Sequence, residues 1–113
     1  MGQIVPSLDP DGQEVYYFIW CDEDDGTNTS GDNGYLQGET ISSYTLTAGT
    51  GLSVDADSSA AVTINGVSYA INTVVGATVT TTGNDGDNID LTCEIDTGTR
   101  IEDKTITIPI REH

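Results

Sequence analysis

The sequence predicts an all-β fold, an antiparallel β-sandwich of seven to eight short strands, and three observations lead to this prediction. Residues that favour strands, such as Thr, Val, Ile and Tyr, are abundant, whereas strong helix formers are scarce. Apolar and polar residues alternate in several short segments. Turn residues separate these segments about every ten residues, which is the usual spacing in a sandwich.

The clearest strand prediction covers residues 89–96, where apolar and polar residues alternate without interruption. Successive side chains of a strand point to opposite faces, so one face would carry Ile89, Leu91, Cys93 and Ile95. Residues 105–111 repeat the alternation after a turn signal at 97–100. We therefore expect an antiparallel hairpin with one apolar face, which the rest of the chain must cover. Pro109 lacks a backbone N–H, which favours an edge position for the second strand.

The N-terminal part of the chain divides into an arm and a first strand. Residues 1–13 contain Pro6 and Pro10 with little periodicity, so we expect an N-terminal arm followed by one sandwich domain over residues 14–113. Residues 15–20 form the most aromatic segment and are apolar on both alternating rows. This pattern predicts a strand that is buried on both faces.

The odd-numbered residues of this aromatic strand, which point away from the predicted core, are the best candidate for an interaction site. If the even-numbered residues of segment 15–20 face the core, the opposite side carries Val15, Tyr17 and Ile19. Two interpretations stay open at this point. Either the N-terminal arm or a neighbouring strand covers the row, or the row is a subunit interface, where aromatic residues are enriched.

The middle of the chain alternates polar loops with short strands. Residues 21–38 are polar and glycine-rich, and they predict a loop longer than the usual connection, as functional or flexible segments often are. Further strands are expected at 39–47, 52–54, 61–64, 67–71 and 74–82, the last with Gly76 as a bulge or break. Asn65-Gly66 is a strong hairpin signal, because a type I′ turn needs positive φ at both positions.

The charge of the chain excludes some classes of partner. Nineteen acidic residues against 3 basic ones give a formal net charge of -16. Binding to nucleic acid through its phosphates needs clustered Lys and Arg, and an anionic membrane surface would repel this chain. We therefore expect neither nucleic acid nor membrane as a partner. No apolar run is long enough to cross a bilayer, and no signal peptide is recognised, so secretion by that route is not expected.

The two cysteines are predicted to be reduced thiols. Cys93 lies on the apolar face of its strand, whereas Cys21 follows Trp20 by one residue. If Trp20 points inward, strand alternation makes Cys21 point outward, so the two sulfur atoms would not meet. Without a signal peptide, a disulfide is also disfavoured by the compartment.

The acidic loops suggest a calcium hypothesis, since Ca²⁺ prefers oxygen ligands on flexible loops. The candidate ligands fall into two groups, Asp22, Asp24 and Asp25 in one loop and Asp85, Asp87 and Asp90 in another. The first group does not satisfy the EF-hand pattern, because Gly26 occupies the fifth position of a loop that begins at Asp22 and no Glu closes a 12-residue loop. The second group does not satisfy it either, because Asp90 stands where the pattern requires Gly. The alternative interpretation is that these residues form solvated turns of an acidic protein.

No arrangement in the sequence indicates catalysis, and we expect neither an enzyme nor a required cofactor. The single histidine, His113, is the last residue, which is a poor position for an ordered general base. A glycine-rich phosphate-binding loop is also absent from the sequence.

Several short motifs, taken in order, resemble a known family. They are the lead at 9–11, the aromatic strand at 16–20, the Gly-Glu-Thr-Ile-Ser-Ser segment at 38–43, the Gly-Leu-Ser-Val step at 51–54, and the final strands at 91–95 and 106–112. In these motifs the chain is similar to small virion proteins of tailed bacteriophages that are commonly labelled fibre–tail adaptors. Its acidic loop after Trp20 and its segment 65–88 are longer than the resemblance leads us to expect.

The resemblance implies an immunoglobulin-like β-sandwich and a non-enzymatic structural role in the virion, after assembly in the host cytoplasm. Its partners would be other virion proteins (tail, fibre or major capsid subunits), on which the protein would be oligomeric. One alternative is a capsid decoration, or cement, protein that bridges major capsid subunits. A further alternative, of a different class, is a calcium-dependent adhesion or carbohydrate-binding module.

Overall fold

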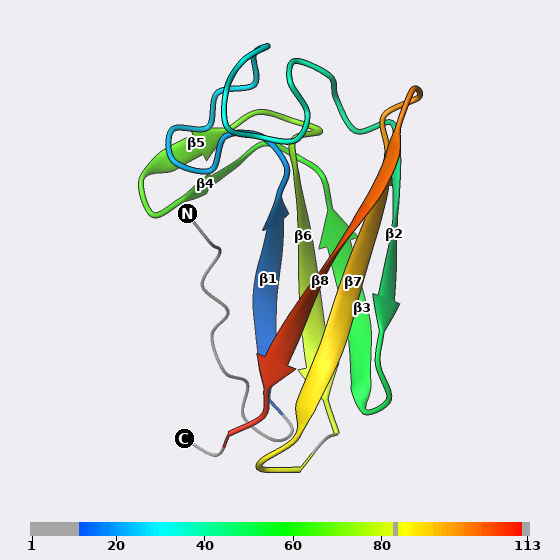
Figure 1. Ribbon diagram of the computed structural model, residues 1–113. Helices are drawn as coiled ribbons and strands as arrows, with labels where there is room; N and C mark the ends of the chain where they lie inside the picture. The colour runs from blue at the N-terminus through cyan, green and yellow to red at the C-terminus, as the bar shows by residue number, and fades with distance from the viewer. Residues whose placement is uncertain (1–11, 83, 112–113) are drawn as a thin grey trace.

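Figure 1 shows the computed structural model of the chain, which describes residues 12–82 and 84–111. These residues form eight strands and no helix, and every pair of neighbouring strands is antiparallel. The predicted all-β antiparallel fold is therefore confirmed. Almost all of the expected N-terminal arm, and His113, lie outside the described residues.

The strands form two three-stranded sheets and one separate hairpin (Figure 1). The first sheet has the order β1-β6-β3, with β1 at Gln13–Ile19, β6 at Val74–Thr81 and β3 at Leu52–Ser58. The second sheet has the order β2-β7-β8, with β2 at Ser43–Ala48, β7 at Asn88–Asp96 and β8 at Ile101–Pro109. The hairpin pairs β4 at Val62–Ile64 with β5 at Val67–Tyr69. The two larger sheets pack through one shared apolar core, as in a sandwich.

Strand alternation builds this core from both sheets. The buried residues of β7 are its predicted apolar row, Ile89, Leu91, Cys93 and Ile95. From the opposing sheet, β1 and β6 contribute Tyr16, Phe18, Val75, Ala77 and Val79. At about 25 cal/mol per Å² of apolar surface removed from water, burial of these rows supplies the main force that holds the layers together.

Both predicted hairpins form as expected. Strand β8 pairs with β7 along its whole length, lies at the edge of its sheet and ends at Pro109. Asn65 and Gly66, which connect β4 to β5, have φ of 50° and 83°. A type I′ turn requires this sign of φ at both positions, which explains the Asn-Gly pair.

Several strand boundaries and one irregularity differ from the sequence predictions; β8, for example, begins at Ile101 and not at 105, and β5 ends at Tyr69 and not at 71. Strand β2 begins at Ser43 rather than near residue 39, because the preceding N–H groups bond outside the β2 ladder, Ile41 to Asn72 O and Ser42 to Asp96 O. Gly76 is neither a bulge nor a break, since it pairs with both neighbouring strands. The register shift lies in β3 instead, between Val54 and Ala56. Strand β3 itself continues to Ser58, beyond the predicted 52–54.

The predicted long loop follows β1 and extends to β2 as residues 21–42 (Figure 1, upper end). It folds back on the end of β1, where the carbonyl of Trp20 accepts the N–H groups of Tyr35 and Leu36. The side chain of Leu36 is fully buried, as is that of Ile41 in large part. The loop therefore closes the upper end of the core and is not merely a connection.

The prediction that Cys21 points outward is wrong. Cys21 and Trp20 are both buried, at 3% and 0% exposure. Strand alternation no longer applies at this position, because β1 ends at Ile19 and the loop covers the next residues. Both thiols are free, as predicted, and burial raises the pKa of each, that of Cys93 to about 12.

Candidate functional site

The outer row of β1 takes the orientation that the sequence predicts. Tyr16 and Phe18 are buried in the core, whereas Val15 is 39% exposed and Tyr17 and Ile19 are half-buried. The row is thus less covered than a strand buried on both faces would be. Within the described residues, Val15 is one of only three large exposed apolar side chains, together with Ile71 and Ile101.

Gly76 explains how Tyr17 lies on the outer face of the sheet. The two residues are opposite each other on β1 and β6. A Cβ atom built on Gly76 would lie 3.0 Å from Cε1 and 3.2 Å from Cδ1 of the Tyr17 ring. The ring therefore packs on the glycine backbone, a close approach that a side chain at this position would obstruct.

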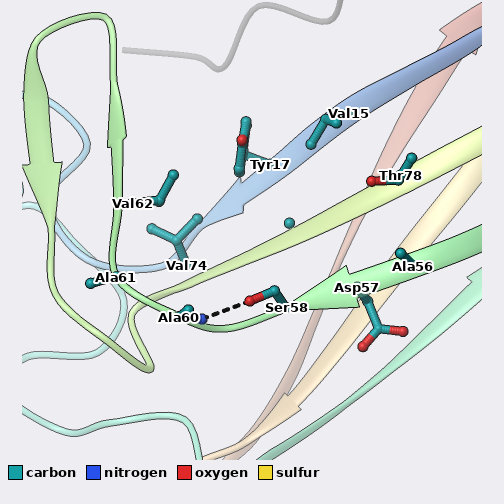
Figure 2. Close-up of a pocket in the computed structure, with 11 residues that line it drawn as sticks. Val15, Tyr17, Ala56, Asp57, Ser58, Ala60, Ala61, Val62, Val74 and Thr78 are labelled. Atoms are coloured by element: carbon teal, nitrogen blue, oxygen red, sulfur yellow. Dashed lines mark hydrogen bonds between the residues drawn. The ribbon is translucent and has the colours of Figure 1, made fainter.

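Beside this ring the outer face of the β1-β6-β3 sheet is hollowed into a groove of about 290 Å³, shown in Figure 2. We call it the β1 groove. Its lining residues come from β1, β3, β6, the segment that leads into β4 and the first residue of β4: Val15, Tyr17, Ala56, Asp57, Ser58, Ala60, Ala61, Val62, Val74, Gly76 and Thr78. Most of these side chains are small or apolar, as in sites that bind an apolar group.

One carboxylate lies at the border of the β1 groove. The hydroxyl of Tyr44, on the other sheet, donates to Oδ1 of Asp57 over 2.5 Å. This hydrogen bond, with burial, raises the pKa of Tyr44 to about 12, since the phenol proton is held between the two groups. The lining thus offers mainly apolar contact, and Asp57, whose carboxylate accepts the Tyr44 hydroxyl, is its one acidic residue.

The structure brings together only part of the predicted interface row. Val15 and Tyr17 line the groove, whereas Ile19 does not. The carbonyl of Ile19 instead accepts a hydrogen bond from Lys104 Nζ of β8 at 2.7 Å. Sequence reasoning missed the contributions of β3, β6 and the β4 approach. The Asn-Gly signal located the β4–β5 hairpin, but it carries no information on which sheet face the hairpin covers.

The first group of predicted calcium ligands is used within its own loop. The buried Asp22 accepts the N–H groups of Asp24 at 3.0 Å and Asn33 at 3.4 Å. Asp25 accepts both the N–H and the hydroxyl of Thr27, and these hydrogen bonds lower the pKa of its carboxyl group. Side chains that hydrogen-bond to nearby backbone in this way fix turns.

The second group lies at the opposite end of the sandwich, in the turn between β6 and β7 and on β7 itself (Figure 1). Asp87 accepts the N–H of Asn84 at 2.8 Å, and Asp90 accepts the hydroxyl of Thr107 at 2.7 Å. The two groups therefore do not form one site. In residues 12–82 and 84–111, no three His, Cys, Asp or Glu side chains are placed to hold a metal ion together.

All three basic side chains of the chain donate to backbone carbonyls. Arg100 donates to the carbonyls of Tyr35 and Leu36, both at 3.1 Å, and its guanidinium lies 4.3 Å from the centre of the Tyr35 ring. Lys104 Nζ lies 4.6 Å from the centre of the Trp20 ring, and desolvation there lowers its pKa. Arg111 donates to the carbonyl of Asp87 at 3.3 Å. The last hairpin thus holds the loop and the end of β1 in place.

This use of the basic residues leaves the acidic residues largely without opposite charge. Within the described part of the chain, the one ion pair joins Arg100 to Glu39, at 3.4 Å. A net charge of -16 therefore acts on the folded state as self-repulsion. This repulsion predicts that stability depends on ionic strength.

Raising NaCl from low to moderate concentration is expected to raise the melting temperature by a few degrees, the shift that about 1 kcal/mol produces in a domain of this size. Salt screens the repulsion between exposed carboxylates, whereas the few attractive pairs between opposite charges have little stability to lose. Thermal unfolding followed by circular dichroism at constant pH checks this. A melting temperature that falls with salt would show that attractive pairs dominate instead.

The described residues contain no helix that is long and apolar enough to cross a membrane. Comparison of this chain with protein-family models, with curated proteins and with solved structures finds no match. The features that bear on function are therefore the geometry of the β1 groove and the sequence motifs.

Proposed function

We propose that this protein is a non-enzymatic structural protein of a tailed-phage virion, which docks onto another virion subunit through the β1 groove. The observation that carries the proposal is the groove itself, an apolar hollow with an exposed Val15 at its side and small side chains along its lining. Exposed apolar patches on a folded domain mark interaction sites. The virion setting comes from the resemblance of the sequence motifs, and an adaptor between fibre and tail is the role that they favour.

The charge of the chain defines the chemistry of the partner. Two copies of a chain with net charge -16 repel each other, so self-association through the groove is opposed. A partner segment with apolar side chains for the groove and Lys or Arg beside them meets both the lining and the carboxylate of Asp57. We therefore expect the occupant to be an apolar segment of a different virion subunit, flanked by basic residues.

A single engineered thiol tests whether the groove is the docking surface. Ala61 is exposed and lines the groove, and both native cysteines are buried, so Ala61→Cys adds one accessible thiol. We expect this thiol to react rapidly with an alkylating reagent in the free protein and to be protected in purified virions. As a control, Ile101→Cys places a thiol on an exposed apolar position outside the groove, where we expect equal reaction in both states.

The other outcomes contradict the proposal. Slow reaction of Ala61→Cys in the free protein would mean that residues 1–11 or a second copy occupy the groove, and dilution distinguishes these two. Equal reaction in the free protein and in virions would place the interface elsewhere.

The copy number in the virion identifies the role. Counted against the major capsid protein by quantitative mass spectrometry, roughly a dozen copies or fewer fit an adaptor on the tail axis. On the order of hundreds of copies would fit decoration of the capsid, since only the shell repeats that often. Absence from purified virions would contradict the proposed function altogether.

The β1 groove is also tested by mutation. Val15→Asp places a charge against the apolar lining at a position that is 39% exposed, so we expect the fold to persist and incorporation into virions to fall about tenfold, the effect of about 1.4 kcal/mol. Ile101→Asp is the matched control, because it adds the same charge at a position that is 65% exposed and outside the groove. Incorporation is measured by mass spectrometry of purified particles. Equal incorporation of the two variants would exclude Val15 from the interface.

A further inference from the structure

The chain contains two Asn-Gly pairs in contrasting environments, Asn33-Gly34 in the long loop and Asn65-Gly66 in the turn between β4 and β5. Asn-Gly is the dipeptide in which the following backbone nitrogen most easily reaches the asparagine side chain, because glycine presents no Cβ. The two pairs therefore offer the same local chemistry, and only the surrounding structure distinguishes them.

The backbone at Gly34 is held in place. Its N–H donates to Oδ1 of Asp32 at 2.8 Å, and the N–H of Asn33 donates to Asp22. A Cβ atom built on Gly34 would lie 2.3 Å from the carbonyl carbon of Cys21, which shows how closely the two backbone segments pack. The nitrogen of Gly34 cannot swing towards the Asn33 side chain without opening this part of the loop.

The backbone at Gly66 has none of these restraints. Asn65 and Gly66 are both exposed, and a Cβ atom built on Gly66 meets no atom within 4 Å. Among the described residues, neither the Asn65 side chain nor the Gly66 N–H has a hydrogen-bond partner outside the strand ladders. The turn connects strands of only three residues each, a hairpin that opens at low cost.

We propose that Asn65 is a site of spontaneous deamidation and that Asn33 is protected from it. The Gly66 nitrogen attacks Cγ of Asn65, so that the N–Cγ bond forms and the Cγ–Nδ2 bond breaks. The nitrogen gives up its proton, and ammonia leaves. Water then opens the cyclic imide at either carbonyl, and the product is an aspartyl or an isoaspartyl residue. No oxidant or reductant is required.

The product changes a part of the molecule that borders the β1 groove. Strand β4 begins at Val62, which lines the groove, and the type I′ turn keeps β4 paired with β5. An isoaspartyl residue carries the backbone through its side chain, which adds one methylene group to the turn and alters the strand register. Each conversion also adds one negative charge to an already acidic chain.

Incubation of the folded full-length protein at mildly alkaline pH tests the assignment. Peptide mapping by mass spectrometry, with enzymatic methylation of isoaspartyl carboxylates as a second readout, follows each asparagine separately. We expect Asn65 to convert at least roughly tenfold faster than Asn33, the protection that a local opening free energy of about 1.4 kcal/mol confers. In denaturant, where the loop no longer holds Gly34, the two rates should converge.

The controls isolate the role of the loop. Ser30→Ala, at an exposed loop position, should leave both rates unchanged. Asp32→Ala removes the carboxylate that accepts the Gly34 N–H and should raise the rate at Asn33 only. Equal rates at the two sites in the folded protein, or faster conversion of Asn33, would overturn the proposal.

Discussion

Replacement of Trp20 with alanine is expected to lower the free energy of unfolding by about 3–5 kcal/mol, the range for a large aromatic side chain removed from a core. Trp20 is fully buried where β1 meets the long loop. Its ring contacts Tyr35 edge to face, with ring centres 5.7 Å apart, and supports the ammonium of Lys104. The substitution thus removes core packing together with the aromatic and cation–π contacts that hold the loop and β8.

Unfolding of the Trp20→Ala variant in urea should be followed by far-ultraviolet circular dichroism, because the chain has no other tryptophan for fluorescence. Val15→Ala on the same strand is the matched control, and its exposed position limits the expected loss to about 1 kcal/mol. A loss below about 1 kcal/mol for Trp20→Ala would show that the end of β1 is not part of the cooperative core.

The strands could be predicted from the sequence because their signals are local. The alternation in β7 and β8 determines which side chains face the core, and the Asn-Gly pair determines a turn that needs positive φ. These patterns involve residues close together in the chain. Strand alternation and turn geometry can therefore be inferred from these residues without knowledge of the rest of the fold.

The loop and the groove could not be predicted, because both depend on contacts between distant segments. The burial of Cys21 and Leu36 follows from the way the loop folds back on Trp20, and nothing in a polar, glycine-rich segment specifies that path. The β1 groove likewise needs Val62, at the start of the β4–β5 hairpin, to line the same hollow as Tyr17 of β1. Of the groove, only Val15 and Tyr17 were indicated by the sequence, because the strand that carries them has apolar residues on the outer face as well as on the core face.

Gly34→Ala tests whether the long loop is a structural part of the domain, and we expect it to lower the free energy of unfolding by about 3 kcal/mol, the upper part of the usual range for overpacking. The added Cβ would lie 2.3 Å from the carbonyl carbon of Cys21 and 2.6 Å from the nitrogen of Asp22. Both are backbone atoms, which cannot rotate away as a side chain can. Gly34 is not among the residues with positive φ, so the expected loss comes from this contact and not from the backbone preference of alanine.

The loop itself supplies a control and a local readout for Gly34→Ala. Ser30→Ala changes an exposed position of the same loop and should alter stability by no more than about 0.5 kcal/mol. Displacement of the loop in the glycine variant should also expose Cys21, so its thiol should be alkylated under native conditions while Cys93, in the middle of β7, stays protected. Wild-type stability with Cys21 still protected would mean that the two backbone segments separate at little cost. Global loss of structure, with both thiols reactive, would instead show that closure of the core by this loop is required for the whole sandwich to fold.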